Sequence, residues 1–197
     1  MTTKKNINNT LVFLLILFSF LINRHYSNFG LEAGDTFVLY NGGYKVLNGL
    51  VPFKDYWLTT GPLMDYFNAF FFSIGEVSWS TYTTHSSFFN VLITLTTFFF
   101  LKNFKLNIYF CFLYTIFFSI LMYPVVGTPF VDHHSTIFLL VSFYVFIIAI
   151  KNEKYEFFSF IPLLLLLSFL CKQTPASYGI IAITFLTILS FLLLKNY

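Results

Sequence analysis

The sequence predicts an all-α polytopic membrane protein. Of its 197 residues, 57% are hydrophobic, 23% are aromatic and only 10% are charged, whereas a soluble domain carries about 25% charged residues. Its apolar runs approach the length of a bilayer-spanning helix, which needs about 20 mainly apolar residues because no unpaired backbone group can face lipid. We therefore expect about six transmembrane helices in one membrane-embedded unit over residues 1–197, with two interfacial amphipathic helices in a long first outer loop.

Six segments are apolar enough to cross the membrane when their flanks are included. They are residues 7–23, 82–101, 106–123, 135–150, 157–171 and 177–194. The first follows Lys4 and Lys5, as the apolar region of a signal peptide would, but no small-residue cleavage site comes after it. We interpret it as a retained helix.

The basic residues predict the orientation of these helices, because Lys and Arg favour cytoplasmic loops. With the N-terminus in the cytoplasm, the basic residues inside are Lys4, Lys5, Lys102, Lys105, Lys151, Lys154 and Lys195, and those outside are Arg24, Lys45, Lys54 and Lys172. Most acidic residues then face outward, so the polar chemistry is expected on the extracytoplasmic side. The cations make no continuous basic face, which argues against nucleic acid as a partner.

Residues 24–81 form the first extracytoplasmic loop and are the one connection with room for a site. The stretch "DTFVLYNGGYKVLNG" has near-helical apolar spacing and closes on Gly49. The stretch "GPLMDYFNAFFFSIG" opens with a Gly-Pro pair, a helix-start signal, and stops at Gly75. Both are predicted to be interfacial amphipathic helices, with Asp65 on the polar face of the second.

The loop "LEAGDTFVLYNGGYKVLNGLVPFKDYWLTTGPLMDYFNAFFFSIG", residues 31–75, resembles that of the GT-C membrane glycosyltransferases. It is most similar to bacterial members of the family 39-like group, which are related to protein mannosyltransferases and aminoarabinose transferases. The shared pattern is a loop Asp, a helix ending in Gly, an aromatic and acidic element, and a Pro-Leu pair opening a second interfacial helix. The other helices match only as topology, so the chain resembles the N-terminal module of such an enzyme.

The resemblance implies that a sugar passes from a polyprenyl-phosphate donor to an acceptor hydroxyl, lipid or glycan. The reaction would take place at the extracytoplasmic face of a bacterial inner membrane, in the making of a cell-envelope glycan. The partners implied are this donor, membrane lipids and an unidentified acceptor. Because the chain ends in "LLLKNY" directly after a span, a C-terminal partner or a further segment is also expected.

Asp35 matches the loop Asp that, in the family, lies in the catalytic cavity and orients or deprotonates the acceptor hydroxyl. The chemistry agrees, since a hydroxyl is a poor nucleophile and a carboxylate within hydrogen-bond reach can take its proton. The alternative role is a helix N-cap, because Asp35 directly precedes an apolar periodic run. Asp55 matches the acid of the second element, where substrate contacts are made, and its alternative is a solvated interfacial acid.

Two departures from the family pattern leave the phosphate ligand open. Thr36 stands where family members often carry a second acid, and no cation lies between Asp55 and the next proline. Phosphate needs donors or positive charge, and the outer candidates are Arg24, Lys45, Lys54, Lys172 and the histidines. Lys172 and Gln173, in a short turn before Pro175, are the preferred contacts, with snorkelling of Lys172 as the alternative.

Asp132, His133 and His134 lie at the outer end of the third and fourth spans. Imidazole binds either phosphate or a divalent metal, but adjacent histidines without another spaced ligand are a weak metal signal and cannot both face one point in a helix. We assign these residues to donor or cavity contacts, with no metal or other cofactor; a divalent metal is the weaker alternative. The plainer interpretation is a hydrated helix start capped by Asp132 or Ser135.

A second interpretation of the whole chain is a non-enzymatic polytopic protein, such as a transporter or flippase component or a scaffold. Transporters place ionisable groups near the bilayer midplane, in repeated and broken helices. Here the span centres are mostly Phe, Leu and Ile, with the charges at the ends. A scaffold would tolerate Asp35→Asn, whereas the enzyme would not.

Overall fold

A computed structural model describes residues 2–29, 33–123 and 127–194, and these residues are predominantly helical. The helices are α1 (Thr2–Tyr26), α2 (Ala33–Leu47), α3 (Leu63–Ile74), α4 (Trp79–Lys102), α5 (Ile108–Met122), α6 (Val131–Lys151), η1 (Tyr155–Phe160), α7 (Ile161–Cys171) and α8 (Gln173–Leu194). Extended pairing in these residues is limited to an isolated bridge between Pro52 and Tyr56. The all-α expectation is therefore confirmed for the part of the chain described.

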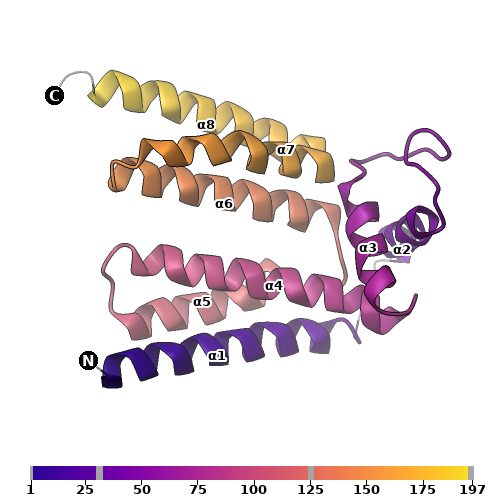
Figure 1. The fold of residues 1–197 in the computed structure, drawn as a ribbon, viewed down its shortest axis with the longest axis horizontal. Helices are drawn as coiled ribbons and strands as arrows, with labels where there is room; N and C mark the ends of the chain where they lie inside the picture. The colour runs from indigo at the N-terminus through magenta and orange to yellow at the C-terminus, as the bar shows by residue number, and fades with distance from the viewer. Residues whose placement is uncertain (1, 30–32, 124–126, 195–197) are drawn as a thin grey trace.

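The long helices form a bundle in which α1, α4 and α5 lie on one side and α6, α7 and α8 on the other (Figure 1). Successive helices of the bundle alternate in direction, so the first and last helices bring both ends of the chain to one end of it. We call this the terminal end. The opposite end carries α2, α3 and the loop between them, and we call it the cap end.

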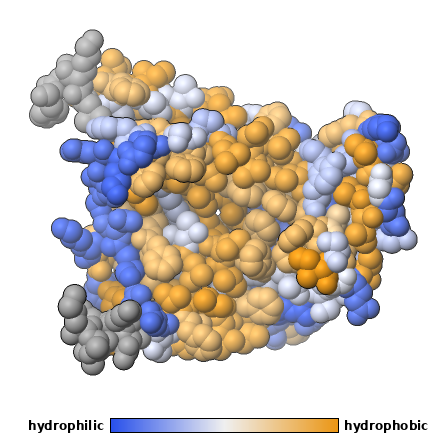
Figure 2. Space-filling view, in the orientation of Figure 1, coloured by the Kyte–Doolittle hydropathy of each residue, from blue (hydrophilic) through white to orange (hydrophobic). Residues whose placement is uncertain are grey.

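The surface of the bundle is apolar along its middle, with hydrophilic residues at the terminal end and a mixed surface at the cap end (Figure 2). Large apolar side chains such as Phe13, Leu121 and Phe185 are 62%, 77% and 64% exposed. Exposing apolar surface to water costs about 25 cal/mol per Å², whereas hydrocarbon imposes no such cost. The chain is therefore an integral membrane protein.

Four of the described helices are long and apolar enough to cross a membrane. They are residues 7–26 of α1, α4, α6, and residues 173–193 of α8. The expectation of about six spans is thus met only in part, because α5 has 15 residues and rises about 22 Å, short of a hydrocarbon core of about 30 Å. The run of η1 and α7 over Tyr155–Cys171 is likewise apolar but short.

The turn expected before Pro175 is confined to Lys172, whose backbone is extended at φ −153 and ψ 130. Helix α8 begins at Gln173, so Pro175 lies in its first turn. The interpretation of this proline as part of a loop was wrong, because a first-turn N–H has no helical partner and Pro loses nothing there.

The two helices expected in the first loop are present as α2 and α3, and glycines let them pack closely. A Cβ atom at Gly42 would lie 2.2 Å from Oδ1 of Asp65, and one at Gly43 would lie 2.4 Å from Cβ of Asn68. This contact leaves Asp65 and Asn68 buried between the helices. The expectation that Asp65 lies on a polar outer face was therefore wrong.

Buried apolar side chains from five helices join the cap end to the bundle. They are Leu39, Met64, Phe72, Tyr82, Val131 and Cys171. A second cluster, made by Phe89, Ile93, Tyr123 and Ile137, joins the two sides of the bundle between α4 and α6. The position of α3 is therefore set by the same helices that carry the predicted site residues.

Gly61 is the point where the loop before α3 touches the end of α7. Its N–H donates to the carbonyl of Cys171 at 3.1 Å, and a Cβ atom there would lie 1.9 Å from the carbonyl oxygen of Leu170. We predict that Gly61→Ala lowers the free energy of unfolding by about 1–3 kcal/mol, because the clash is with backbone and forces α7 to move. Thermal unfolding in detergent micelles measures this. Gly34→Ala is the control, since a Cβ atom at Gly34 meets nothing within 4 Å; equal stability of the two variants would contradict the close contact.

Candidate functional site

Asp35 lies in the first turn of α2, with its side chain exposed at the cap end. The next residue, Thr36, is buried; its carbonyl accepts a hydrogen bond from Tyr82 at 3.1 Å and its hydroxyl lies 3.4 Å from that of Thr128. Asp35 itself has no hydrogen bond or ion pair with any residue in the described ranges. Because Asp35 sits inside the helix, it does not occupy the N-cap position, and its carboxylate oxygens are available to a substrate.

Lys172 and Asp132 are brought together at the cap end by α6 and α7. The ammonium of Lys172 lies 2.8 Å from each carboxylate oxygen of Asp132, and the two side chains are 31% and 36% exposed. Ser135 holds the adjacent backbone by donating to the carbonyl of Lys172 at 3.2 Å, and it also bonds to Ser168 at 2.9 Å. An anion that binds Lys172 therefore has to compete with Asp132.

His133 and Gln173 lie beside this ion pair in sequence. Nδ1 of His133 is buried and has no partner among the described residues, while its ring lies 5.0 Å from that of Tyr123, centroid to centroid. Gln173 is the first residue of α8, and its carbonyl accepts from Ser177 at 2.8 Å. The Lys172–Asp132 ion pair thus brings their sequence neighbours Gln173 and His133 to the same end of the bundle.

Asp55 and Lys54 lie in the tight loop between α2 and α3, where both are exposed. Asp55 accepts a hydrogen bond from the N–H of Val51 at 2.8 Å through Oδ2 and so closes the loop on itself. Phe53, inside this loop, has a φ of 64, an unusual conformation for a bulky residue. Asp55 thus has a structural task in this loop, and Lys54 has no partner among the described residues.

Asp65 is the buried carboxyl group of the cap, with 1% of its surface exposed. Oδ2 accepts a hydrogen bond from the hydroxyl of Tyr56 at 2.7 Å, and the ammonium of Lys45 lies 4.6 Å from the centroid of that ring. Burial raises the pKa of Asp65 to about 6, although the hydrogen bond from Tyr56 and the charge of Lys45 act in the opposite direction. Burial and the neighbouring carboxylate also raise the pKa of Tyr56.

A chain of buried polar side chains links α3 to the bundle. Oδ1 of Asn68 lies 2.7 Å from Nδ1 of His85, and Nε2 of His85 lies 3.0 Å from Nε2 of His134. Nδ1 of His134 is 3.1 Å from the hydroxyl of Tyr123. The four residues come from α3, α4, α6 and the residue after α5, and all are fully buried. We call them the histidine chain.

The partners of the histidine chain determine where its hydrogens lie. The carbonyl of Leu39 can only accept, so the amide nitrogen of Asn68 faces it at 3.1 Å and Oδ1 faces His85. Nδ1 of His85 therefore carries a hydrogen, and its Nε2 accepts from the Nε2–H of His134. In neutral His134, Nδ1 then accepts from the hydroxyl of Tyr123. Two neutral imidazoles thus satisfy the positions between Asn68 and Tyr123. The carbonyl of Phe130 lies 3.1 Å from Nδ1 of His134 but accepts only from the backbone N–H of His134, at 3.2 Å, in this arrangement.

Aromatic rings enclose the two histidines. Phe71 stacks on His85 with centroids 4.8 Å apart, and Phe89 lies 4.3 Å from the ring of His134. His134 therefore sits apart from His133 and from solvent, with its ring nitrogens occupied by protein groups. The sequence grouped the two histidines with Asp132, but a helix turns adjacent residues to different faces.

Sequence reasoning gave no role to Asn68, and it treated His85 as a satisfied polar residue without identifying its partners. Each is a single polar residue inside an apolar segment, and the two are 17 positions apart. No local spacing links them to each other or to His134. The available signal was the cost of burying an unpaired polar group in a span, which predicts that each has a partner but does not identify it.

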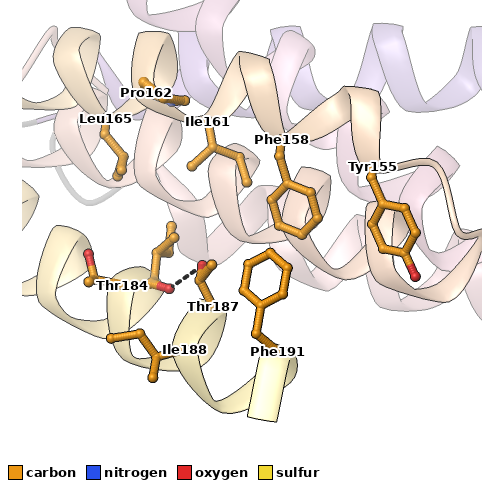
Figure 3. A pocket seen from close by; sticks show the side chains of 10 residues that line it. Tyr155, Phe158, Ile161, Pro162, Leu165, Thr184, Thr187, Ile188 and Phe191 are labelled. Carbon is orange, nitrogen blue, oxygen red and sulfur yellow. Dashed lines mark hydrogen bonds between the residues drawn. The ribbon is translucent and has the colours of Figure 1, made fainter. Parts of the chain in front are cut away.

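The described residues offer neither a cluster of metal ligands nor a polar cavity in the groove described next. Within the described residues, no three His, Cys, Asp or Glu side chains are close enough to share a metal ion. A groove of about 920 Å³ runs between α7 and α8 (Figure 3). Its walls include Phe158, Ile161 and Leu165 on one side and Ile183, Ile188 and Phe191 on the other. It suits a hydrocarbon chain but has no ionisable group suited to phosphate or to proton transfer at neutral pH.

The chain matches no protein-family model, no curated protein and no solved structure. Its activity is therefore inferred from its residues and their arrangement.

The raised pKa of Asp65 predicts a pH-dependent stability. The folded state holds this proton more tightly than the unfolded state, whose Asp has a pKa of about 4. The contribution to stability is therefore complete below about pH 4 and is lost as the pH rises to about 6. Asp65→Asn should remove this part of the slope, on the order of 2–3 kcal/mol across that range. Unfolding midpoints of the two proteins between pH 4 and 7 test this, and parallel curves would contradict it.

The histidine chain predicts strong coupling between its members. His85→Leu leaves Oδ1 of Asn68 and the Nε2–H of His134 buried without partners, so we expect the free energy of unfolding to fall by about 2–4 kcal/mol. The double variant with His134→Leu should lose less than the sum of the single losses. His25→Leu, at an exposed position, is the control in the same thermal unfolding assay. Additive losses would show that the two imidazoles do not depend on each other.

Proposed function

We propose that the chain is a GT-C type glycosyltransferase module that moves a sugar from a polyprenyl-phosphate-linked donor to an acceptor hydroxyl, lipid or glycan. The observation that carries the proposal is the arrangement of the first loop. Two helices lie at one end of an apolar bundle, and the carboxylate of Asp35 is exposed in the first turn of the first helix. This is the arrangement that the resemblance of residues 31–75 implies.

The proposed topology has six spans, with the terminal end in the cytoplasm of a bacterium and the cap end outside its inner membrane. Lys102, Lys105, Lys151 and Lys154 follow or end helices that finish at the terminal end, which agrees with the positive-inside rule. α5 and α7 would complete their crossings with the residues that flank them. The first loop then meets a lipid-linked donor on the extracytoplasmic side.

In the proposed reaction, Asp35 acts as the base. The acceptor oxygen attacks the anomeric carbon while the bond from that carbon to the phosphate oxygen breaks, and the polyprenyl phosphate leaves with the bonding electrons. The acceptor proton passes to Asp35, whose carboxylate has no competing partner among the described residues. A positioned carboxylate of this kind contributes about 10²–10⁴-fold to such a reaction.

The phosphate side of the proposed site is the region around Lys172. Its ammonium is already held in place by Asp132 at 2.8 Å, so the donor phosphate would take the place of that carboxylate. The unpartnered Nδ1 of His133 and the side chain of Gln173 lie nearby in sequence and offer further hydrogen bonds. Asp132 stays nearby after the exchange, so the donor phosphate binds there against the repulsion of that carboxylate.

One observation favours a second candidate, a transporter or flippase component. Oδ1 of Asn23, Oδ1 of Asn90 and Oγ1 of Thr94 are buried and have no protein partner among the described residues. Polar atoms of this kind inside spans are costly and often mark a path for a polar solute. None of these atoms bonds to Asp35 in the described residues, so a variant of that residue separates the two candidates.

Asp35→Asn is the decisive variant for the enzyme proposal. We expect it to lower transfer of labelled sugar from a panel of polyprenyl-phosphate donors by at least about 100-fold, with expression unchanged. Glu76→Gln, which alters another exposed carboxylate at the cap end, is the matched control and should keep its activity. Equal turnover of Asp35→Asn and wild type would remove Asp35 from the mechanism. No turnover of any donor by the wild type would favour the second candidate.

A further inference from the structure

Arg24 is held in a defined orientation at the cap end of α1. Nη1 donates to the carbonyl of Ser80 at 2.9 Å and to the hydroxyl of Thr83, and Nη2 donates to the hydroxyl of Ser80 at 3.2 Å. A guanidinium carries five N–H groups. One on Nη2 and the one on Nε therefore remain without a partner among the described residues. These two nitrogens share the edge of the guanidinium that binds two oxygens of a phosphate or carboxylate.

The charge of Arg24 also differs from that of the other cations at the cap end. Lys172 is neutralised by Asp132, and Lys45 lies over the ring of Tyr56, whose hydroxyl binds Asp65. The three partners of Arg24 are all neutral, and no carboxylate in the described residues pairs with it. Lys54 also lacks a partner, but nothing in the described residues fixes its direction. Arg24 is thus a preorganised cation with no counter-charge among residues 2–29, 33–123 and 127–194.

An apolar groove of about 480 Å³ lies between α1 and α5, and its lining on α1 ends at His25, the residue after Arg24. Its walls include Leu14, Leu17, Leu21 and His25 on α1, with Phe112 and Ile116 on α5. Arg24 is not itself a lining residue, and its guanidinium contacts α4. It follows Leu21 by three residues and Leu17 by seven, so its Cα lies above these two wall residues on α1. From Leu14 to His25 the helix rises about 17 Å, close to half of a hydrocarbon core of about 30 Å. The groove is therefore about as long as one leaflet is thick.

We propose that Arg24 and this groove form a binding site for an anionic phospholipid of the leaflet at the cap end. The phosphate binds the free edge of the guanidinium, where His25 adds a further hydrogen-bonding group, and one acyl chain lies in the groove between α1 and α5. The charge at the mouth, the apolar walls and the one-leaflet length each fit such a lipid. The site does not depend on sugar transfer, and it lies on the helix that precedes α2, so a bound lipid supports the start of the cap.

Photo-crosslinking tests the site by position. The full chain is placed in phosphatidylcholine vesicles with a trace of phosphatidic acid that carries a photoreactive group in one acyl chain. Diacylglycerol with the same chain is the probe without phosphate. We expect phosphatidic acid to label residues 14–25 and 112–116 preferentially and diacylglycerol to label them weakly. Equal labelling by the two probes, or phosphatidic acid labelling spread evenly over the helices, would overturn the proposal.

Two pairs of variants separate the head-group contact from the groove. Arg24→Gln should lower labelling by phosphatidic acid about tenfold, the effect of losing one charge-assisted contact, whereas Lys54→Gln should not change it. Ile116→Trp fills the groove and should lower labelling, whereas Leu121→Trp, at a position 77% exposed on the same helix, should not. Arg24→Lys keeps the charge but loses the two-pronged guanidinium, so its labelling by phosphatidic acid should lie between that of wild type and that of Arg24→Gln. Unchanged labelling in both Arg24→Gln and Ile116→Trp would contradict the proposal. This outcome does not depend on the result of the sugar-transfer assay.

Discussion

The hydrogen bond between the two imidazoles, Nε2 to Nε2 at 3.0 Å, is the interaction on which the cap end depends. In the interior of a membrane protein there is no water to satisfy an unpaired polar group, and leaving one unpaired costs free energy. His85 and His134 meet that requirement through each other, Asn68 and Tyr123, with the carbonyl of Phe130 also 3.1 Å from Nδ1 of His134. Since Asn68 belongs to α3, satisfying the two histidines also holds the cap helix against the spans.

Some polar residues of the cap end are buried and hydrogen-bonded, whereas others are exposed at the surface. Asp65 and the histidine chain are buried, because Gly42 and Gly43 let α2 and α3 approach to contact. Asp35 and Asp55 remain on the surface, the first without a partner in the described residues and the second closing its own loop. A buried polar layer thus lies beneath an exposed carboxylate at the cap end.

Features with a signal in neighbouring residues were predicted better than features that depend on residues distant in the sequence. Helix α3 was predicted well because its signals are local: a Gly-Pro pair before it and Gly75 after it. The start of α8 was placed too late, at residue 177, because the polar residues around Pro175 were interpreted as a turn, although a proline in the first turn is compatible with a helix. Asp132 and Lys172 were each placed at the outer end of the bundle, but their ion pair was not predicted, because it depends on the packing of α6 against the end of α7. The partnership of Asn68 with His85 was not predicted either, because it depends on which face of α3 meets α4.

What the sequence by itself determined is the class of protein, the positions of most helices and the end of the bundle that carries the polar loop. Composition, apolar run length and charge bias act over a few residues to a single span, so they can be read along the chain. The tertiary structure alone decided which polar groups are buried and which are free. That choice depends on the contact of glycines in α2 with α3 and on the pairing of two histidines 49 positions apart. Burial is a property of the packed surfaces, and no local pattern in the chain encodes it.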